Sequence, residues 1–241
     1  MKLKKIIRQM IIRQTHPNRY NSEVYVKYLK SKGCKIGEGT YFFSPLDTEV
    51  DVSRPYLIEI GKYCKITKGV HILAHESRSV LRMKYGKIYN SAKPTKIGDN
   101  VFVGMKTIIL PGANIGNNVI IGAGSLVTKD IPDNVIVGGN PAKVIMSLDE
   151  YKEKREKLLL DEAIFYARRI KENTGRLPTI NEMGDFYPLY FSGSINELNN
   201  LGVFPRCNGD DREDFIKSIN NNQPMFNSFS SFINFVFNKE D

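Results

Sequence analysis

Tryptophan is absent from this chain of 241 residues, and cysteine occurs only three times. Cys34, Cys64 and Cys207 are far apart and have no CxxC spacing. This pattern argues against a disulfide framework and against a cysteine zinc site, so we expect no bound metal. Cys64 follows the phase of the repeat described below, and we interpret it as a small core residue.

The chain also lacks a long hydrophobic run. Near its start, the apolar residues of 6–12 alternate with charges, which excludes a signal peptide or membrane span there and predicts a cytoplasmic protein. The net charge is +9, and residues 1–30 hold most of it, with eight Lys or Arg against Glu23 alone. No nucleic-acid motif and no aromatic interleaving accompany these charges, so we expect no nucleic-acid partner.

Six hexapeptides run without interruption from Ile97 to Pro132. Every sixth residue is β-branched and aliphatic: Ile97, Val103, Ile109, Ile115, Ile121 and Val127. A second set of mostly small residues lies four places later: Val101, Thr107, Ala113, Val119, Ser125 and Ile131. A helix would rotate these positions around its circumference, whereas a solenoid of short strands and corners turns one of them inward per hexapeptide.

Glycine follows four of the inward residues, at positions 98, 104, 116 and 122. We expect a side chain there to crowd the bend and the backbone to need a positive φ. Three hexapeptides would close one triangular coil of about eighteen residues, which stacks on its neighbours through backbone hydrogen bonds.

The same phase occurs upstream in Ile60, Ile66 and Ile72, but the spacing to Ile97 is one more than a multiple of six. Residues 73–96 are therefore predicted to leave the coil as a loop. Long loops on a rigid scaffold often carry function.

We predict three segments: a basic helical segment 1–33, a repeat domain 34–146 and a helical extension 147–241. Within the first, we favour a capping role for helix 3–14 on the first coil over contact with a membrane surface. A second helix is expected to begin at Asn21 or Ser22 and end at Gly33. In the extension, capping boxes start helices at 147 and 179, and the phenylalanines at 226–235 are expected to pack on the repeat domain or a partner subunit.

Four stretches of the sequence carry a resemblance to a known family: 72–76 (ILAHE), 96–104 (KIGDNVFVG), 121–132 (IGAGSLVTKDIP) and 139–145 (GNPAKVI). Together they resemble the hexapeptide-repeat acyltransferases, and within them the sugar O-acetyltransferases of the maltose, galactoside and capsular polysaccharide groups. The resemblance covers about residues 36–170. It implies a mainly β fold, a left-handed parallel β-helix, and a homotrimer with sites between subunits. It also implies acetyl-CoA as acyl donor and a sugar or glycan acceptor in surface polysaccharide biosynthesis.

The resemblance also implies site residues. His75, at the start of the loop, takes the role of general base, since a near-neutral imidazole can remove a hydroxyl proton. The backbone N–H of Met105, which follows Gly104, becomes the oxyanion donor. The residues expected at acetyl-CoA are Gly104, Ala123, Thr128, Lys129 and Lys143.

The resemblance specifies the residues that bind the acceptor less closely than those that bind acetyl-CoA. Asp47 takes the place of a family Asn and could bind a sugar hydroxyl or orient His75. Glu76 is the other candidate for orienting the imidazole, and Arg78 and Tyr85 of the loop are candidates for binding the substrate. The chain departs from some members at Met146, where they carry a second basic residue for a phosphate.

Three alternatives stay open. N-acetylation of an amino sugar or antibiotic would use the same fold and base. A β-helical scaffold without activity is the non-enzymatic hypothesis. A γ-class carbonic anhydrase would need three zinc-binding histidines from two subunits, and here the third histidine, His16, lies outside the repeats.

Overall fold

The repeat region folds into three parallel sheets. The computed structural model describes residues 2–77, 79–205 and 208–237. The first sheet contains β1 (Lys35–Ile36), β4 (Ile58–Ile60), β9 (Thr95–Ile97) and β12 (Asn114–Ile115). The second contains β2 (Tyr41–Phe42), β5 (Lys65–Ile66), β10 (Phe102–Val103), β13 (Ile120–Ile121), β15 (Val135–Gly138) and β16 (Lys143–Ser147). The third contains β3 (Glu49–Val50), β6 (His71–Ile72), β11 (Ile108–Ile109) and β14 (Leu126–Val127).

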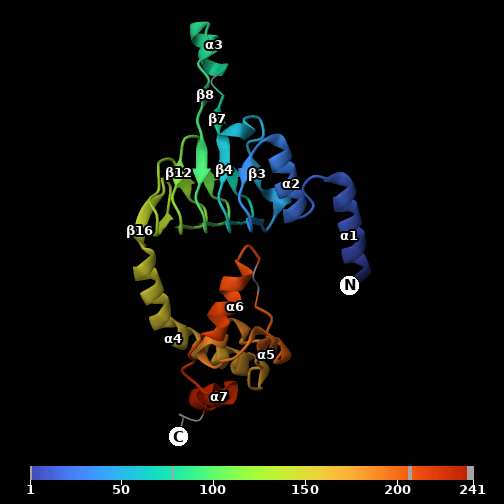
Figure 1. Cartoon of the computed structure of the whole chain (residues 1–241), viewed down its shortest axis with the longest axis vertical. Coiled ribbons are helices and arrows are strands. Elements are labelled where there is room, and N and C mark those ends of the chain that lie inside the picture. Colours follow the sequence, from blue (N-terminus) through green and yellow to red (C-terminus); the bar gives the residue numbers. More distant parts are fainter. Residues whose placement is uncertain (1, 78, 206–207, 238–241) are drawn as a thin grey trace. The chain divides into compact units, whose positions relative to one another are not determined.

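Successive strands enter the three sheets in turn, so each coil contributes one strand to each side (Figure 1). Among the described strands of these three sheets, β16 alone is antiparallel to its neighbour, β15. The predicted phase is confirmed across the excursion, because Ile60 pairs with Ile97, Ile66 with Val103 and Ile72 with Ile109. Two 3₁₀ turns, η1 (Pro45–Asp47) and η2 (Pro55–Leu57), complete the first coils.

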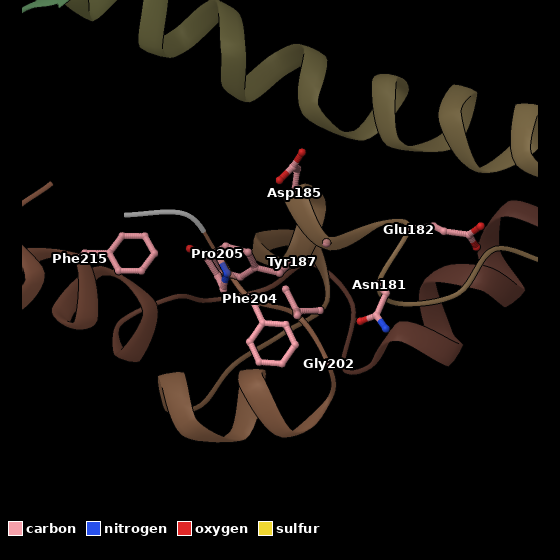
Figure 2. Close-up of a pocket in the computed structure, with 10 residues that line it drawn as sticks. Asn181, Glu182, Asp185, Tyr187, Gly202, Phe204, Pro205 and Phe215 are labelled. Atoms are coloured by element: carbon pink, nitrogen blue, oxygen red, sulfur yellow. The ribbon is translucent and has the colours of Figure 1, made fainter. Parts of the chain in front are cut away.

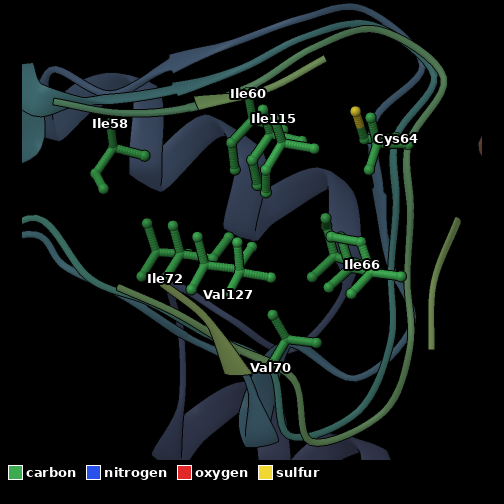
Figure 3. Close-up of a cluster of buried hydrophobic side chains, with 14 of the residues drawn as sticks. Ile58, Ile60, Cys64, Ile66, Val70, Ile72, Ile115 and Val127 are labelled. Atoms are coloured by element: carbon green, nitrogen blue, oxygen red, sulfur yellow. The ribbon is translucent and has the colours of Figure 1, made fainter. Parts of the chain in front are cut away.

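The inward aliphatic residues form the core of the coil (Figure 3). All six from Ile97 to Val127 are at most 2% exposed, as are Ile60, Ile66 and Ile72 upstream. Burying one such side chain stabilises the fold by about 1.5–3 kcal/mol. Cys64 is buried beside them, and burial raises the pKa of its thiol to about 11. Cys207 lies outside the described residues.

The glycines after the inward residues serve close approach between coils. A Cβ on Gly98 would lie 2.6 Å from the Gly116 carbonyl oxygen, and one on Gly104 would lie 2.5 Å from the Ala123 nitrogen. The expected crowding is thus confirmed, but the expected positive φ at these glycines is wrong. The left-handed residue comes two places later, as at Asn100 with φ 55°. The chain therefore turns at the corner residue, and not at the glycine that follows the inward residue.

The excursion is more ordered than the predicted loop. Strands β7 (His75–Glu76) and β8 (Ser91–Ala92) pair antiparallel and carry helix α3 (Ser79–Tyr85) between them (Figure 1). Several apolar side chains of this arm are exposed: Val80, Met83, Tyr85, Ile88 and Tyr89.

The first coil is capped by α2 (Ser22–Lys32), and not by α1 (Lys2–Thr15). Tyr25 and Leu29 of α2 are at most 2% exposed and belong to the core of the coil. On α1, by contrast, Ile7 and Met10 are 48% and 65% exposed. The side chain of Ile6 lies outside the described residues. The prediction that helix 3–14 forms the cap is therefore corrected, while the predicted Asn21 and Gly33 caps of the second helix are confirmed.

The chain divides into two compact units, Met1–Tyr151 and Lys152–Asp241. The capping box of Ser147 and Glu150 begins α4 (Leu148–Thr174), whereas the box at Thr179 and Glu182 closes a turn before η3 (Gly184–Leu189). The second unit also contains α5 (Ile195–Asn200), α6 (Arg212–Asn220) and α7 (Phe229–Phe237).

The phenylalanines of 226–235 do not pack as predicted. They join a separate core inside the second unit, in which Phe232 is fully buried against Tyr190 and Phe226. This core has no member from the repeat region.

Candidate active site

His75 begins β7, where the chain leaves the third side of the coil. Ala74, directly before it, is fully buried at the corner. The side chain of His75 is 40% exposed, so solvent reaches the imidazole. His71, four residues earlier on β6, is exposed.

The imidazole of His75 meets a carboxylate from the preceding coil. Nδ1 of His75 lies 2.5 Å from Oδ2 of Asp51 and 3.2 Å from Oγ of Ser53. Asp51 follows the inward Val50 of β3, which pairs with Ile72, so the stacking of coils brings the two side chains together. The same Asp51 oxygen accepts the backbone N–H of Ala74 at 3.0 Å.

The Asp51 side chain is only 5% exposed. Burial alone would raise the pKa of this carboxyl, but hydrogen bonds from Ser53, His75 and the Ala74 backbone outweigh it. The pKa of Asp51 therefore lies below its usual range. The group is ionised at neutral pH and acts as an acceptor, which favours a proton on Nδ1 of His75 and leaves Nε2 with a free lone pair.

The predicted oxyanion donor lies at another corner of the same chain. Met105 follows β10, and the next residue, Lys106, donates its N–H to the Lys68 carbonyl, so this corner is level with the start of the third side. His75 lies at the end of that side. The extended strand β6 and its flanking residues separate these two corners, so Met105 and His75 lie at opposite ends of one side of the coil.

The predicted acetyl-CoA residues divide between these two corners. Gly104 and Ala123 stack beside Met105, whose carbonyl accepts the Gly124 N–H at 2.7 Å. Lys143 lies near them, because the adjacent Ala142 donates to Leu126 at the start of β14. Thr128 and Lys129 follow the other end of β14. Ala123, Thr128, Lys129 and Lys143 are exposed and Gly104 is buried.

Among the described acceptor candidates, neither Asp47 nor Tyr85 is a hydrogen-bond partner of the His75 imidazole. Asp47 lies in η1, where Ser44 donates to its carboxylate at 2.5 Å and Lys68 Nζ is 3.7 Å away. Tyr85 is 60% exposed at the end of α3, and Glu76 is exposed on β7. Arg78 lies outside the described residues.

Sequence reasoning missed Asp51 and Ser53 and offered Asp47 or Glu76 as the residue that orients His75. The structure places Asp51 on Nδ1 instead. The hexapeptide period could not have found Asp51, because the inward Val50 before it lies 22 residues ahead of its partner Ile72 and so falls outside the period of six.

Within residues 2–77, 79–205 and 208–237, no cluster of three or more His, Cys, Asp or Glu is arranged to hold a metal ion. No helix in this described part of the chain has the length and hydropathy needed to cross a membrane.

Comparison with known proteins gives the same family for the repeat. Residues 94–129 match the model for the bacterial transferase hexapeptide, six repeats. Protein CapG of Staphylococcus aureus is 43% identical over 155 residues, which cover 64% of this chain and 86% of CapG. Galactoside O-acetyltransferase of Escherichia coli is 38% identical over 130 residues, 53% of this chain and 59% of that enzyme. The match thus spans about three fifths of the E. coli enzyme.

Two solved structures are also similar. A galactoside acetyltransferase in complex with coenzyme A is 26% identical, with a TM-score of 0.43 over 63% of this chain and 82% of that one. A maltose O-acetyltransferase from Clostridium difficile is 30% identical, with a TM-score of 0.37 over 52% of this chain and 75% of that one.

Proposed function

The chain belongs to the hexapeptide-repeat transferases and is an acyltransferase, and we propose that it moves an acetyl group from acetyl-CoA to a hydroxyl of a sugar or glycan. The sugar acceptor rests on the similarity to galactoside O-acetyltransferase and on the motifs shared with that group. We place the reaction in surface polysaccharide biosynthesis on the same motif resemblance.

The observation that carries this proposal is the Asp51–His75 pair. An exposed imidazole with a buried carboxylate on Nδ1 is oriented to take a proton at Nε2. His75 accepts the proton of the acceptor hydroxyl as its oxygen attacks the thioester carbonyl. The C–S bond then breaks, and the departing CoA sulfur receives the proton from the imidazolium. Asp51 stabilises that imidazolium and stays ionised.

The remaining roles in the proposed reaction are assigned to residues at the two corners of the coil. The Met105 N–H would stabilise the oxyanion that forms on the thioester carbonyl. Ala123 leaves room for the pantetheine arm beside the coil. Lys129 and Lys143 would pair with the phosphates of CoA as point charges, with Thr128 as a hydroxyl donor.

We propose a homotrimer of left-handed β-helices in which each site uses two chains. This proposal is supported by the position of the His75 and Met105 corners at opposite ends of one side of the coil, which a neighbouring copy would bring together. The exposed apolar side chains of the 73–96 arm support such packing, because patches of this kind mark protein interfaces.

The test is CoA release from acetyl-CoA in the presence of a panel of nucleotide sugars, free glycans and amino sugars. We expect His75→Ala to lower kcat by roughly 10²–10⁴ with little effect on donor binding. His71→Ala is the matched control, since it removes an exposed histidine from the same side of the coil. Turnover of His75→Ala near that of His71→Ala would exclude the base. Exclusive transfer to amino groups would favour N-acetylation, and no turnover on any acceptor would favour the scaffold hypothesis.

A further inference from the structure

The second unit contains a cavity of about 540 Å³ that takes no part in the proposed chemistry (Figure 2). Its wall comes from three segments: the turn before η3 together with the first residues of η3, the stretch that follows α5, and Phe215 of α6. None of these residues belongs to the candidate active site. The volume is in the range of small-ligand sites and exceeds the space that one sugar ring needs.

Three polar side chains of this wall make no hydrogen bond or ion pair with other described residues: the Asn181 amide, the Asp185 carboxylate and the Tyr187 hydroxyl. Tyr187 is half-buried, and burial raises the pKa of its phenol. Its hydroxyl oxygen is reached by solvent, so a ligand in the cavity can pair with it. By contrast, Glu182 of the same wall is fully engaged with Arg176 and Thr179.

The backbone at Gly202 allows the Asn181 side chain to take its position. Gly202 has φ +82°, and a Cβ there would lie 2.6 Å from Oδ1 of Asn181. The glycine therefore lets the amide lie directly against the chain that follows α5. Substitution of Gly202 by any larger residue would displace the Asn181 amide.

Phe204 adds a flat apolar surface. Its ring is 72% exposed although it adjoins the buried Val203. In Figure 2, Phe204 and Asn181 lie on one side of Tyr187 and Asp185 lies on the other. An extended ligand could contact both sides, whereas a compact one could contact only one.

We infer that this cavity binds a neutral oligosaccharide of more than one sugar ring. A sugar presents a C–H face that packs on an aromatic ring and an edge of hydroxyl groups that pair with amide, carboxylate and phenol. The described residues of the cavity wall include no lysine or arginine, and the free carboxylate of Asp185 repels phosphate, so these residues do not favour a nucleotide or CoA. That the bound glycan is the acceptor for acetylation rests on the proposed function; the binding itself does not.

The experiment is saturation-transfer NMR on the full chain with neutral oligosaccharides of one to six rings, in the absence of acetyl-CoA. The probes are maltose-series, cellulose-series and chitin-series oligomers. We expect binding to strengthen from one ring to three, and Phe204→Ala and Asp185→Asn each to weaken it about tenfold. Phe165→Ala is the matched control, because Phe165 is also an exposed phenylalanine of the second unit, 64% exposed, and lies outside the cavity wall.

Asn181→Ala and Gly202→Ala should weaken binding as well, with thermal unfolding checked for each variant. His75→Ala should bind the oligosaccharides as the unaltered chain does, which separates this site from the active site. If no oligosaccharide binds, or if Phe204→Ala and Phe165→Ala bind equally, the inference is wrong even when acetyl transfer is intact. Binding lost in Phe204→Ala would support it even if acetyl transfer were never observed. A preference for peptides over all sugars would also overturn it.

Discussion

Asp51 and His75 are 24 residues apart in the chain, yet Oδ2 of the first lies 2.5 Å from Nδ1 of the second. The contact joins two successive coils across the register of Val50 and Ile72. The Asp51 carboxylate is buried and therefore held in place. The His75 imidazole is half-exposed and faces the solvent from which substrates arrive.

Asp51→Asn should lower kcat by roughly 10²–10⁴, because an amide no longer stabilises the imidazolium or holds the Nδ1 proton. Glu76→Gln is the control, since it removes the carboxylate adjacent to His75 in sequence. Steady-state rates of CoA release for the two variants decide whether Asp51 or Glu76 orients His75. A larger loss in Glu76→Gln than in Asp51→Asn would transfer the orienting role to Glu76.

Asp51 should also make stability depend on pH. Its pKa is lowered in the folded chain, so the ionised form adds stability above its unfolded pKa of about 3.9, and this contribution is lost as pH falls through the folded pKa. Asp51→Asn should therefore unfold at a lower temperature than the unaltered chain at pH 7, and the difference should shrink in acid. A difference that grows as the pH falls would contradict the assigned shift. Thermal unfolding over a pH series measures it.

Gly98→Ala should destabilise the coil by about 1–3 kcal/mol, the usual cost of forcing a methyl into packed backbone. Gly122→Ala is matched to it, because both follow an inward residue but the nearest atom to a Cβ on Gly122 is 3.4 Å away, against 2.6 Å for Gly98. Denaturant unfolding should show a much smaller loss for Gly122→Ala. Equal losses would mean that backbone conformation, and not close approach, selects glycine.

Lys129→Ala and Lys143→Ala should each raise the KM for acetyl-CoA, and the effect should shrink with a phosphate-free acetyl-pantetheine donor. Lys217→Ala, on α6 of the second unit, controls for the general loss of a positive charge. An equal penalty with both donors would indicate a folding role for the lysine.

Mixed assembly tests the shared site. When His75→Ala chains are unfolded and refolded together with Lys143→Ala chains, some sites should combine an intact His75 corner with an intact Lys143 corner of a neighbour, and activity should partly return. Light scattering gives the number of chains. A monomer that turns over substrate would rule out the trimer.

Leu29→Ala should destabilise the repeat unit by about 2–5 kcal/mol, because Leu29 is fully buried in the cap formed by α2. Ile11→Ala on α1, whose side chain is 55% exposed, should change stability little.

Deletion of residues 1–14 then tests the membrane hypothesis: anionic vesicles should bind the full chain and the deleted chain equally weakly. Salt-sensitive binding lost on deletion would restore a membrane role for α1.

The sequence by itself determined the architecture of the repeat. A period of six places one aliphatic residue inward per side, and this local rule repeats from Ile60 to Val127 regardless of what surrounds it. The sequence also marked where the coil is interrupted, and so pointed to His75. Motif resemblance supplied the family and the chemistry.

Only the tertiary structure decided which groups meet. Asp51 reaches His75 because coils stack, and the glycines are needed because the next coil approaches, neither of which a single hexapeptide records. The phenylalanines after 226 show the same limit: their spacing marks an apolar face, but which surface covers it depends on long-range packing, and it proved to be the second unit's own core. A periodic pattern fixes the direction of each side chain relative to its own backbone, whereas the identity of its neighbour is set by segments that are distant in the chain and become adjacent only on folding.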